Sequence, residues 1–173
     1  MNSLSQFKSI TTFVLDVDGV LTDGSLFLLA DGQMVRRMNI KDGYALQLAI
    51  KKGYRVLVIS GAKSDAVINR LNRLGIMDVF MGAEDKTAVL NQYIRQHQLQ
   101  KDQILFMGDD MPDLAVMQLV GLPCCPADAV QEIREISTYT SPYTGGKGCV
   151  RDVIEKVLKL NGDWDNASGV SAI

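Results

Sequence analysis

The chain has 173 residues, 47% of them hydrophobic, which suits one domain with a sizeable core. Its formal net charge of -2 gives no polybasic field, so we expect neither nucleic acid nor a membrane as a partner. Residues 1–10 lack a signal-peptide core, and three cysteines with a single histidine argue against a zinc site. We therefore expect buried, reduced thiols in a cytoplasmic protein.

The first predicted strand is the apolar run 12–15, which leads into Asp16-Val17-Asp18-Gly19. A β-hairpin is predicted over residues 25–38, where two extended segments flank the turn Ala30-Asp31-Gly32. Residues 26–29 are apolar without alternation, so we infer that another part of an assembly covers this hairpin.

Predicted helices and strands then alternate along the chain. The helices cover 42–52 (capped by Asp42), 64–74 (capped by Ser64), 84–97, 112–120, 129–136 and about 150–158, and the strands cover 55–59, 79–81, 104–107 and 122–125. The glycine-rich segment 142–148 is predicted to be a mobile loop, and 161–173 a flexible tail. This order predicts an α/β fold, with a three-layer, Rossmann-like parallel sheet and helices on both faces, in one domain over residues 1–160.

Carboxylates follow two of the predicted strands. Asp16 and Asp18 follow the first, and Asp109, Asp110 and Asp113 follow the strand 104–107. Ligands of open α/β sheets bind at the carboxyl edge, and carboxylates gathered there repel one another unless a cation joins them. Mg²⁺ prefers such oxygen ligands, so we expect a magnesium site that handles phosphate.

Each acidic position has a chemical and a plainer interpretation. Asp16 could attack phosphorus, and Asp18, two residues on and on the same face, could transfer protons. By itself, Asp-x-Asp-Gly fits a solvated turn equally well. Asp109 is expected to ligate the metal directly, with Asp110 and Asp113 in supporting positions, although Asp110 alone could simply cap a helix.

Three further positions are candidates for binding phosphate. Ser60 and Gly61 end the strand 55–59, where a hydroxyl and a bare N–H could hold phosphate oxygens. Lys86 lies in the first turn of a predicted helix, a place that cations usually avoid. The segment 145–148 fails as a P-loop, and a flap whose Lys147 reaches substrate is the better interpretation. Taken singly, each of these residues also fits an ordinary turn or a solvated lysine.

Taken in order, these residues resemble the haloacid dehalogenase superfamily of phosphotransferases. The matching pattern is Asp16-x-Asp18, Ser60, Lys86 and Gly108-Asp109-Asp110-x-x-Asp113. The strings DVDGVLTDG and GGKGCVRDVIEKVL, with the hairpin between them, are similar to the branch of sugar-acid phosphatases that act on 3-deoxy-D-manno-octulosonate 8-phosphate. The likeness extends over residues 13–158.

The resemblance implies specific roles. Asp16 is the expected nucleophile and Asp18 the general acid/base, and Mg²⁺ is held by Asp16, the Asp18 carbonyl and Asp109. Ser60, Gly61 and Lys86 are expected to bind the phosphoryl group. The branch has no cap domain and forms homotetramers with central hairpins and sites at subunit interfaces.

One position departs from the family pattern. Relatives often carry a charged residue after Ser60-Gly61, where this chain has Ala62. Lys63 and Arg70 lie close by in the sequence and could bind the carboxylate of a sugar acid instead.

The expected activity is hydrolysis of a phosphorylated 3-deoxy-2-keto sugar acid through an aspartyl-phosphate. A nine-carbon sugar acid phosphate or another small phosphoester is an alternative substrate. A receiver-like phospho-accepting domain is a second alternative, but receivers place the acidic pair first and the lysine last. A non-catalytic oligomeric partner is a third.

Overall fold

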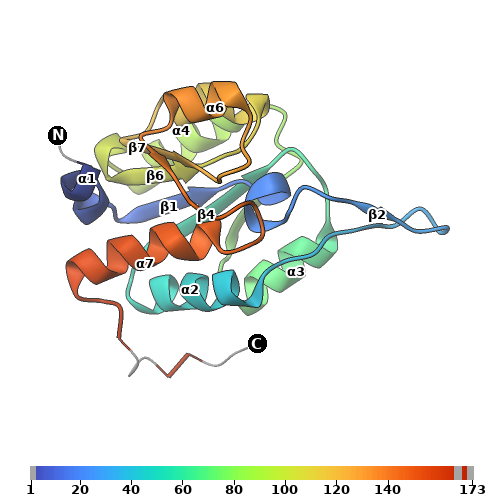
Figure 1. The fold of residues 1–173 in the computed structure, drawn as a ribbon, viewed down its shortest axis with the longest axis horizontal. Helices are drawn as coiled ribbons and strands as arrows, with labels where there is room; N and C mark the ends of the chain where they lie inside the picture. The colour runs from blue at the N-terminus through green and yellow to red at the C-terminus, as the bar shows by residue number, and fades with distance from the viewer. Residues whose placement is uncertain (1–2, 166–168, 171–173) are drawn as a thin grey trace.

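The computed structural model describes residues 3–165 and 169–170. Its centre is a parallel sheet of six strands in the order β5-β4-β1-β6-β7-β8 (Figure 1). The strands are β1 (Thr12–Leu15), β4 (Arg55–Ser60), β5 (Asp78–Met81), β6 (Ile104–Met107), β7 (Leu122–Cys125) and β8 (Tyr139–Thr140). The predicted parallel α/β sheet is confirmed, with β1 in its middle.

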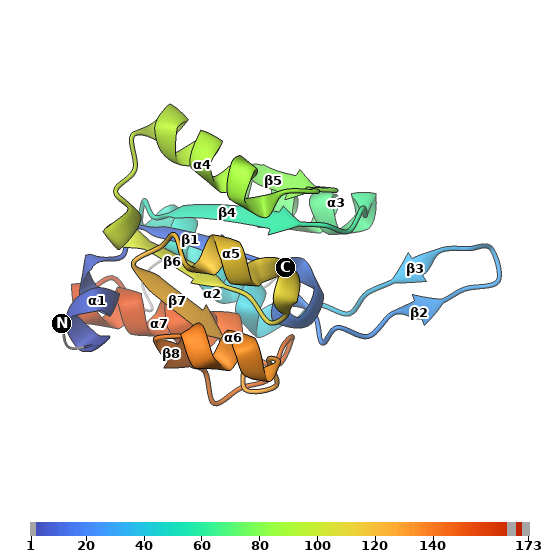
Figure 2. The ribbon, with the colours of Figure 1, turned by 90° about the horizontal axis from the view of Figure 1, so that it is seen from above.

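Helices cover both faces of this sheet (Figures 1 and 2). They are α1 (Ser3–Ser9), α2 (Ile40–Lys51), α3 (Asp65–Arg73), α4 (Lys86–His97), α5 (Leu114–Met117), α6 (Gln131–Ile136) and α7 (Cys149–Asn161), with short 3-10 helices at Lys101–Gln103 and Met111–Asp113. Successive side chains of a strand point to opposite faces, so β1 serves two cores. Phe13 and Leu15 pack among residues of α2, α3 and α7, whereas Val14 packs among residues of α4, α5 and α6.

Several boundaries differ from the sequence predictions. Asn39, not Asp42, caps α2, since its side chain accepts from the Lys41 N–H at 2.8 Å. The helix expected over 112–120 is a 3-10 turn followed by the short α5. The helix α1 and the two-residue strand β8 were missed, because α1 is polar and β8 is too short to show a pattern.

The predicted hairpin is present as β2 (Phe27–Leu28) and β3 (Met34–Val35). It projects away from the body of the protein in both views (Figures 1 and 2). Its apolar side chains are 42–75% exposed, and these are Leu26, Phe27, Leu28, Leu29, Met34 and Val35. Within the described residues no further domain is inserted around the hairpin, and no helix has the length and apolarity to cross a membrane.

Part of the predicted flexible tail lies within the described residues. Asn161 is the last residue of α7, and the Tyr54 hydroxyl donates to Asp163 at 2.7 Å. The ring of Trp164 packs edge-on against Tyr44 at 6.1 Å. Positions 166–168 and 171–173 lie outside the described residues.

Candidate active site

Three strand ends converge at the carboxyl edge of the sheet. Asp16 follows β1, and its two neighbours β4 and β6 end at Ser60 and just before Gly108-Asp109. A cavity of about 400 Å³ opens there. It is lined by Asp16, Asp18, Gly24, Ser60, Gly61, Ala62, Ala83, Glu84, Lys86, Asp109, Asp110, Pro112 and Asp113. The tertiary structure thus brings together the carboxylates that follow β1 and β6, Ser60 and Lys86.

Lys86 occupies the centre of the acidic cluster. The Asp85 side chain caps α4 by accepting from the Ala88 N–H at 2.9 Å, which directs the first helical residue into the site. The Lys86 Nζ donates to Asp113 Oδ1 at 2.7 Å and lies 2.9 Å from Asp16 Oδ1. Burial opposes its charge, but Asp16 and Asp113 outweigh that effect and raise its pKa. Its odd position at a helix N-terminus is explained by this pairing.

Asp113 links Lys86 to the backbone of Asp109. Its side chain is 1% exposed, with one carboxylate oxygen bound to Lys86 and the other accepting from the Asp109 N–H at 3.1 Å. Gly108 makes room for it, since a Cβ there would lie 2.5 Å from Asp113 Cβ. Asp110 instead is exposed and accepts from the Met111 N–H.

The buried carboxylate of Asp16 and the half-buried carboxylate of Asp109 lie close together, so their negative charges lower the stability of the folded protein. Burial, followed by repulsion from Asp113, raises the pKa of Asp16 to about 6. Burial, followed by repulsion from Asp16 and Asp113, raises the pKa of Asp109 to about 7. Both carboxylates would be stabilised by an added positive charge.

The oxygens of this cluster fit a divalent cation. Asp16, Asp109 and Asp113 offer carboxylate oxygens that all lie within 4.8 Å of one another. Asp109 Oδ1 is buried without a hydrogen-bond partner, and Asp16 Oδ1 has only the nearby ammonium, which lies outside hydrogen-bond geometry. Hard oxygen donors with unused lone pairs are what Mg²⁺ requires.

A glycine is needed at position 19, where the turn after Asp16 approaches Asp109. Its φ is +83°, and a Cβ at this position would lie 1.9 Å from Asp109 Oδ2. Only glycine combines this backbone conformation with the close approach of the Asp109 carboxylate.

The segment 142–148 was expected to be a mobile loop, but it is docked on the turn that follows Asp16. The Gly146 N–H donates to the Val20 carbonyl at 2.9 Å, and the Gly145 N–H donates to Asp128 Oδ1 at 2.9 Å. A Cβ on Gly145 would lie 2.0 Å from the Gly19 carbonyl oxygen. Gly145 and Gly146 therefore allow the backbone of this segment to lie in close contact with the backbone of the turn after Asp16.

Asp18 has a partner that the sequence analysis missed. Arg36 donates from Nε to Asp18 Oδ1 at 2.7 Å and from Nη2 to Oδ2 at 3.1 Å. The only signal in the sequence was the pair Arg36-Arg37 directly after the apolar residues Met34-Val35 of the hairpin.

Asp42 also has a role that the sequence did not indicate. It is 1% exposed and accepts from the Arg151 N–H at 2.7 Å, which ties α2 to the first turn of α7. Burial raises its pKa to about 6.

The three other predicted cations lie outside this cavity within a single chain. The Lys63 stem lies across Gly82, and Arg70 lines a groove between α3 and the hairpin base. Lys147 lines a groove over α7 together with Lys41 and Arg151.

Comparison with known proteins agrees with this architecture. Residues 75–154 match the model of the haloacid dehalogenase-like hydrolase family. The 3-deoxy-D-manno-octulosonate 8-phosphate phosphatase of Salmonella typhi is 31% identical over 168 residues, which is 97% of this chain and 89% of that protein.

Solved structures superpose closely on the chain. The Yersinia pestis 3-deoxy-D-manno-octulosonate 8-phosphate phosphatase is 29% identical with a TM-score of 0.91, covering 98% of this chain and 90% of that one. The Moraxella catarrhalis phosphatase of the same name, in complex with magnesium, phosphate and KDO, is 31% identical with a TM-score of 0.88, covering 92% of each chain. The chain therefore belongs to the haloacid dehalogenase-like hydrolase family, as a phosphatase similar to the 3-deoxy-D-manno-octulosonate 8-phosphate phosphatases.

Proposed function

We propose that the protein is a magnesium-dependent phosphatase whose substrate is 3-deoxy-D-manno-octulosonate 8-phosphate. The observation that carries this function is the cluster of Asp16, Asp109 and Asp113 around Lys86, next to Ser60 at the edge of the sheet. The substrate is that named for relatives covering nearly the whole chain.

In the first step a carboxylate oxygen of Asp16 attacks phosphorus. The bond from phosphorus to the sugar oxygen breaks, and Asp18 gives its proton to that oxygen as the alcohol leaves. In the second step Asp18 takes a proton from water, whose oxygen attacks the aspartyl-phosphate. Inorganic phosphate leaves and the Asp16 carboxylate is restored.

The other residues bind and orient the transferred group. Ser60 and the Gly61 N–H line the cavity and can donate to phosphoryl oxygens, while Lys86 supplies a fixed positive charge. Asp16, Asp109 and the Asp18 carbonyl would hold Mg²⁺, which when bound offsets carboxylate and phosphoryl charge.

The test is Mg²⁺-dependent phosphate release from a panel of phosphate esters that includes eight- and nine-carbon 3-deoxy-2-keto acid phosphates. We expect a strong preference for the eight-carbon ester, and no turnover by Asp16→Asn although it stays folded. Preference for a nine-carbon ester would change the substrate, and equal activity on simple esters would remove the sugar-acid specificity. A stable phosphorylated form without turnover would favour a receiver-like domain, and absence of both would favour a non-catalytic one.

The substrate carboxylate needs cations that one chain does not place in the cavity. Ala62 lines it without charge, and Lys86 is the only cationic side chain among the described lining residues. Lys86 is already paired with Asp16 and Asp113. We infer that a neighbouring subunit supplies the missing charge, Lys63, Arg70 and Lys147 being the candidates.

The hairpin is the surface on which such an assembly would form. Its contiguous apolar side chains include Leu28, which is 75% exposed, and a free surface of this kind indicates a protein partner. We infer a homotetramer with central hairpins. In sedimentation velocity Leu28→Glu should release smaller species, whereas Met77→Glu, at an equally exposed apolar residue outside the hairpin, should not. A wild-type monomer would contradict this assembly.

The expected cytoplasmic location belongs to the same proposal. It is supported by three free, buried cysteines, namely Cys124, Cys125 and Cys149.

A further inference from the structure

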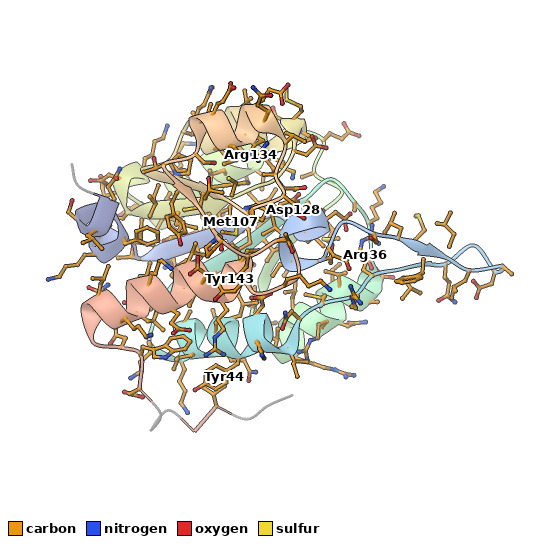
Figure 3. The ribbon with its side chains drawn as sticks, in the orientation of Figure 1. Arg36, Tyr44, Met107, Asp128, Arg134 and Tyr143 are labelled. Carbon is orange, nitrogen blue, oxygen red and sulfur yellow. The ribbon has the colours of Figure 1, made fainter. Side chains whose placement is uncertain are left out.

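The general acid/base Asp18 is held by a residue from a different part of the chain. Arg36 follows β3 on the returning arm of the hairpin and lies at the hairpin base (Figure 3). Its two N–H groups meet the two carboxylate oxygens of Asp18 at 2.7 and 3.1 Å. This two-point contact fixes the plane of the carboxylate as well as its position.

The arginine is the more deeply buried member of the pair. Its side chain is 5% exposed, against 34% for Asp18. The bond to Asp18, which outweighs burial, raises the pKa of Arg36, so the guanidinium stays charged at every working pH. Because the Arg36 guanidinium is buried and always charged, it can hold the Asp18 carboxyl in one orientation while that carboxyl gains and loses a proton during turnover.

Neighbouring contacts attach the same hairpin arm to the turn beyond Asp16. Arg37 donates to Asp23, and Thr22 pairs with Met38 through a β-bridge. Arg36, Arg37 and Met38 thus all contact the turn of residues 18–23. The position of Arg36 therefore depends on how the whole arm packs against this turn.

We propose that Arg36 is a positioning residue for proton transfer, holding the Asp18 carboxyl in line with the leaving oxygen from the base of the hairpin. When Asp18 carries a proton, its carbonyl oxygen still accepts from the guanidinium, and its hydroxyl is free to turn toward the leaving group. Without Arg36 the carboxyl loses this orientation and proton delivery becomes inefficient. This role rests on the proposed phosphatase mechanism.

The experiment compares esters whose leaving groups need a proton to different extents. Glycerol phosphate must release an alkoxide, which requires a proton from Asp18, whereas p-nitrophenyl phosphate releases a stable phenolate. We expect Arg36→Met to lower kcat/KM at least tenfold more for glycerol phosphate than for p-nitrophenyl phosphate, because general acid catalysis is worth about 10²–10⁴-fold. Arg36→Lys, which keeps a charged donor nitrogen but not the two-point contact, should restore part of the difference.

Two further variants separate positioning from structure. Arg73→Met removes an exposed arginine of α3 that does not line the cavity, and should leave the ratio of the two kcat/KM values unchanged. In an Asp18→Asn background, Arg36→Met should have no further effect on this ratio, since no proton remains to be positioned.

Equal losses on both esters, or the same ratio change in the Asp18→Asn background, would overturn the role of Arg36. Wild-type turnover of 3-deoxy-D-manno-octulosonate 8-phosphate, measured alongside, shows that the phosphatase mechanism stands. Absence of that turnover would instead refute the proposed function. The two failures are therefore distinguishable.

Discussion

The repulsion inside the acidic cluster predicts that Asp109→Asn stabilises the protein when no metal is bound. Asp109 has a pKa of about 7 in the folded protein, against an ordinary value of 3.8. Between these two values the folded state holds more protons than the unfolded state, so the free energy of unfolding falls as the pH rises. The loss is complete above about pH 7 and absent below about pH 4.

The size of the effect follows from the shift. About three pH units correspond to about 4 kcal/mol, and we take half, about 2 kcal/mol, because Asp109 is partly exposed and shares its repulsion with Asp16. For a chain of this length, that is about 4–8 °C in Tm. Asparagine has nearly the same shape but no charge, so it should recover this free energy at pH 8.

The assay is thermal unfolding in EDTA and in Mg²⁺, from pH 4.5 to 8. Metal-free Asp109→Asn should exceed wild type at pH 8, and the difference should shrink toward pH 4.5. Mg²⁺ should raise the Tm of wild type and have little effect on the variant. Asp65→Asn, which removes an exposed carboxylate outside the cavity, is the matched control and should show neither the gain in Tm at pH 8 nor a loss of the Mg²⁺ response.

A lower Tm for metal-free Asp109→Asn at pH 8 would refute the reasoning. So would a gain that is the same at every pH, because it could not come from titration.

Three further outcomes follow from the same geometry. Lys86→Met leaves Asp16 and Asp113 buried without their cation, so chemical denaturation should show a loss of about 3 kcal/mol, and phosphate release should fall at least about a hundredfold. Gly145→Ala places a Cβ 2.0 Å from the Gly19 carbonyl oxygen, so both the Tm and the turnover should fall. Burial raises the pKa of two of the three cysteine thiols, and all three are buried, so mass spectrometry should find none alkylated by iodoacetamide at pH 8 until the protein is unfolded.

Much of the fold could be predicted because its signals are local. Short apolar runs alternate with helix caps such as Ser64, whose side chain accepts from the Val67 N–H as expected. A parallel sheet gathers its carboxyl ends at one edge, which places Asp16, Ser60 and Asp109 together once the strands are known.

The remaining features depended on contacts between distant parts of the chain. The Asp18–Arg36 pair joins residues 18 apart, and the bond from Arg151 to Asp42 joins residues 109 apart. No local pattern distinguishes these carboxylates from ordinary turn or cap residues.

The glycines of residues 145–148 show the same limit. By composition they indicate mobility, but in the structure Gly145 and Gly146 lie against the backbone around Gly19 and Val20. A sequence specifies that glycine lacks a Cβ, and only the tertiary structure decides whether that absence permits motion or close packing. The sequence thus determined the strands, the sheet edge and the acidic set, while tertiary packing decided which partner each acid received.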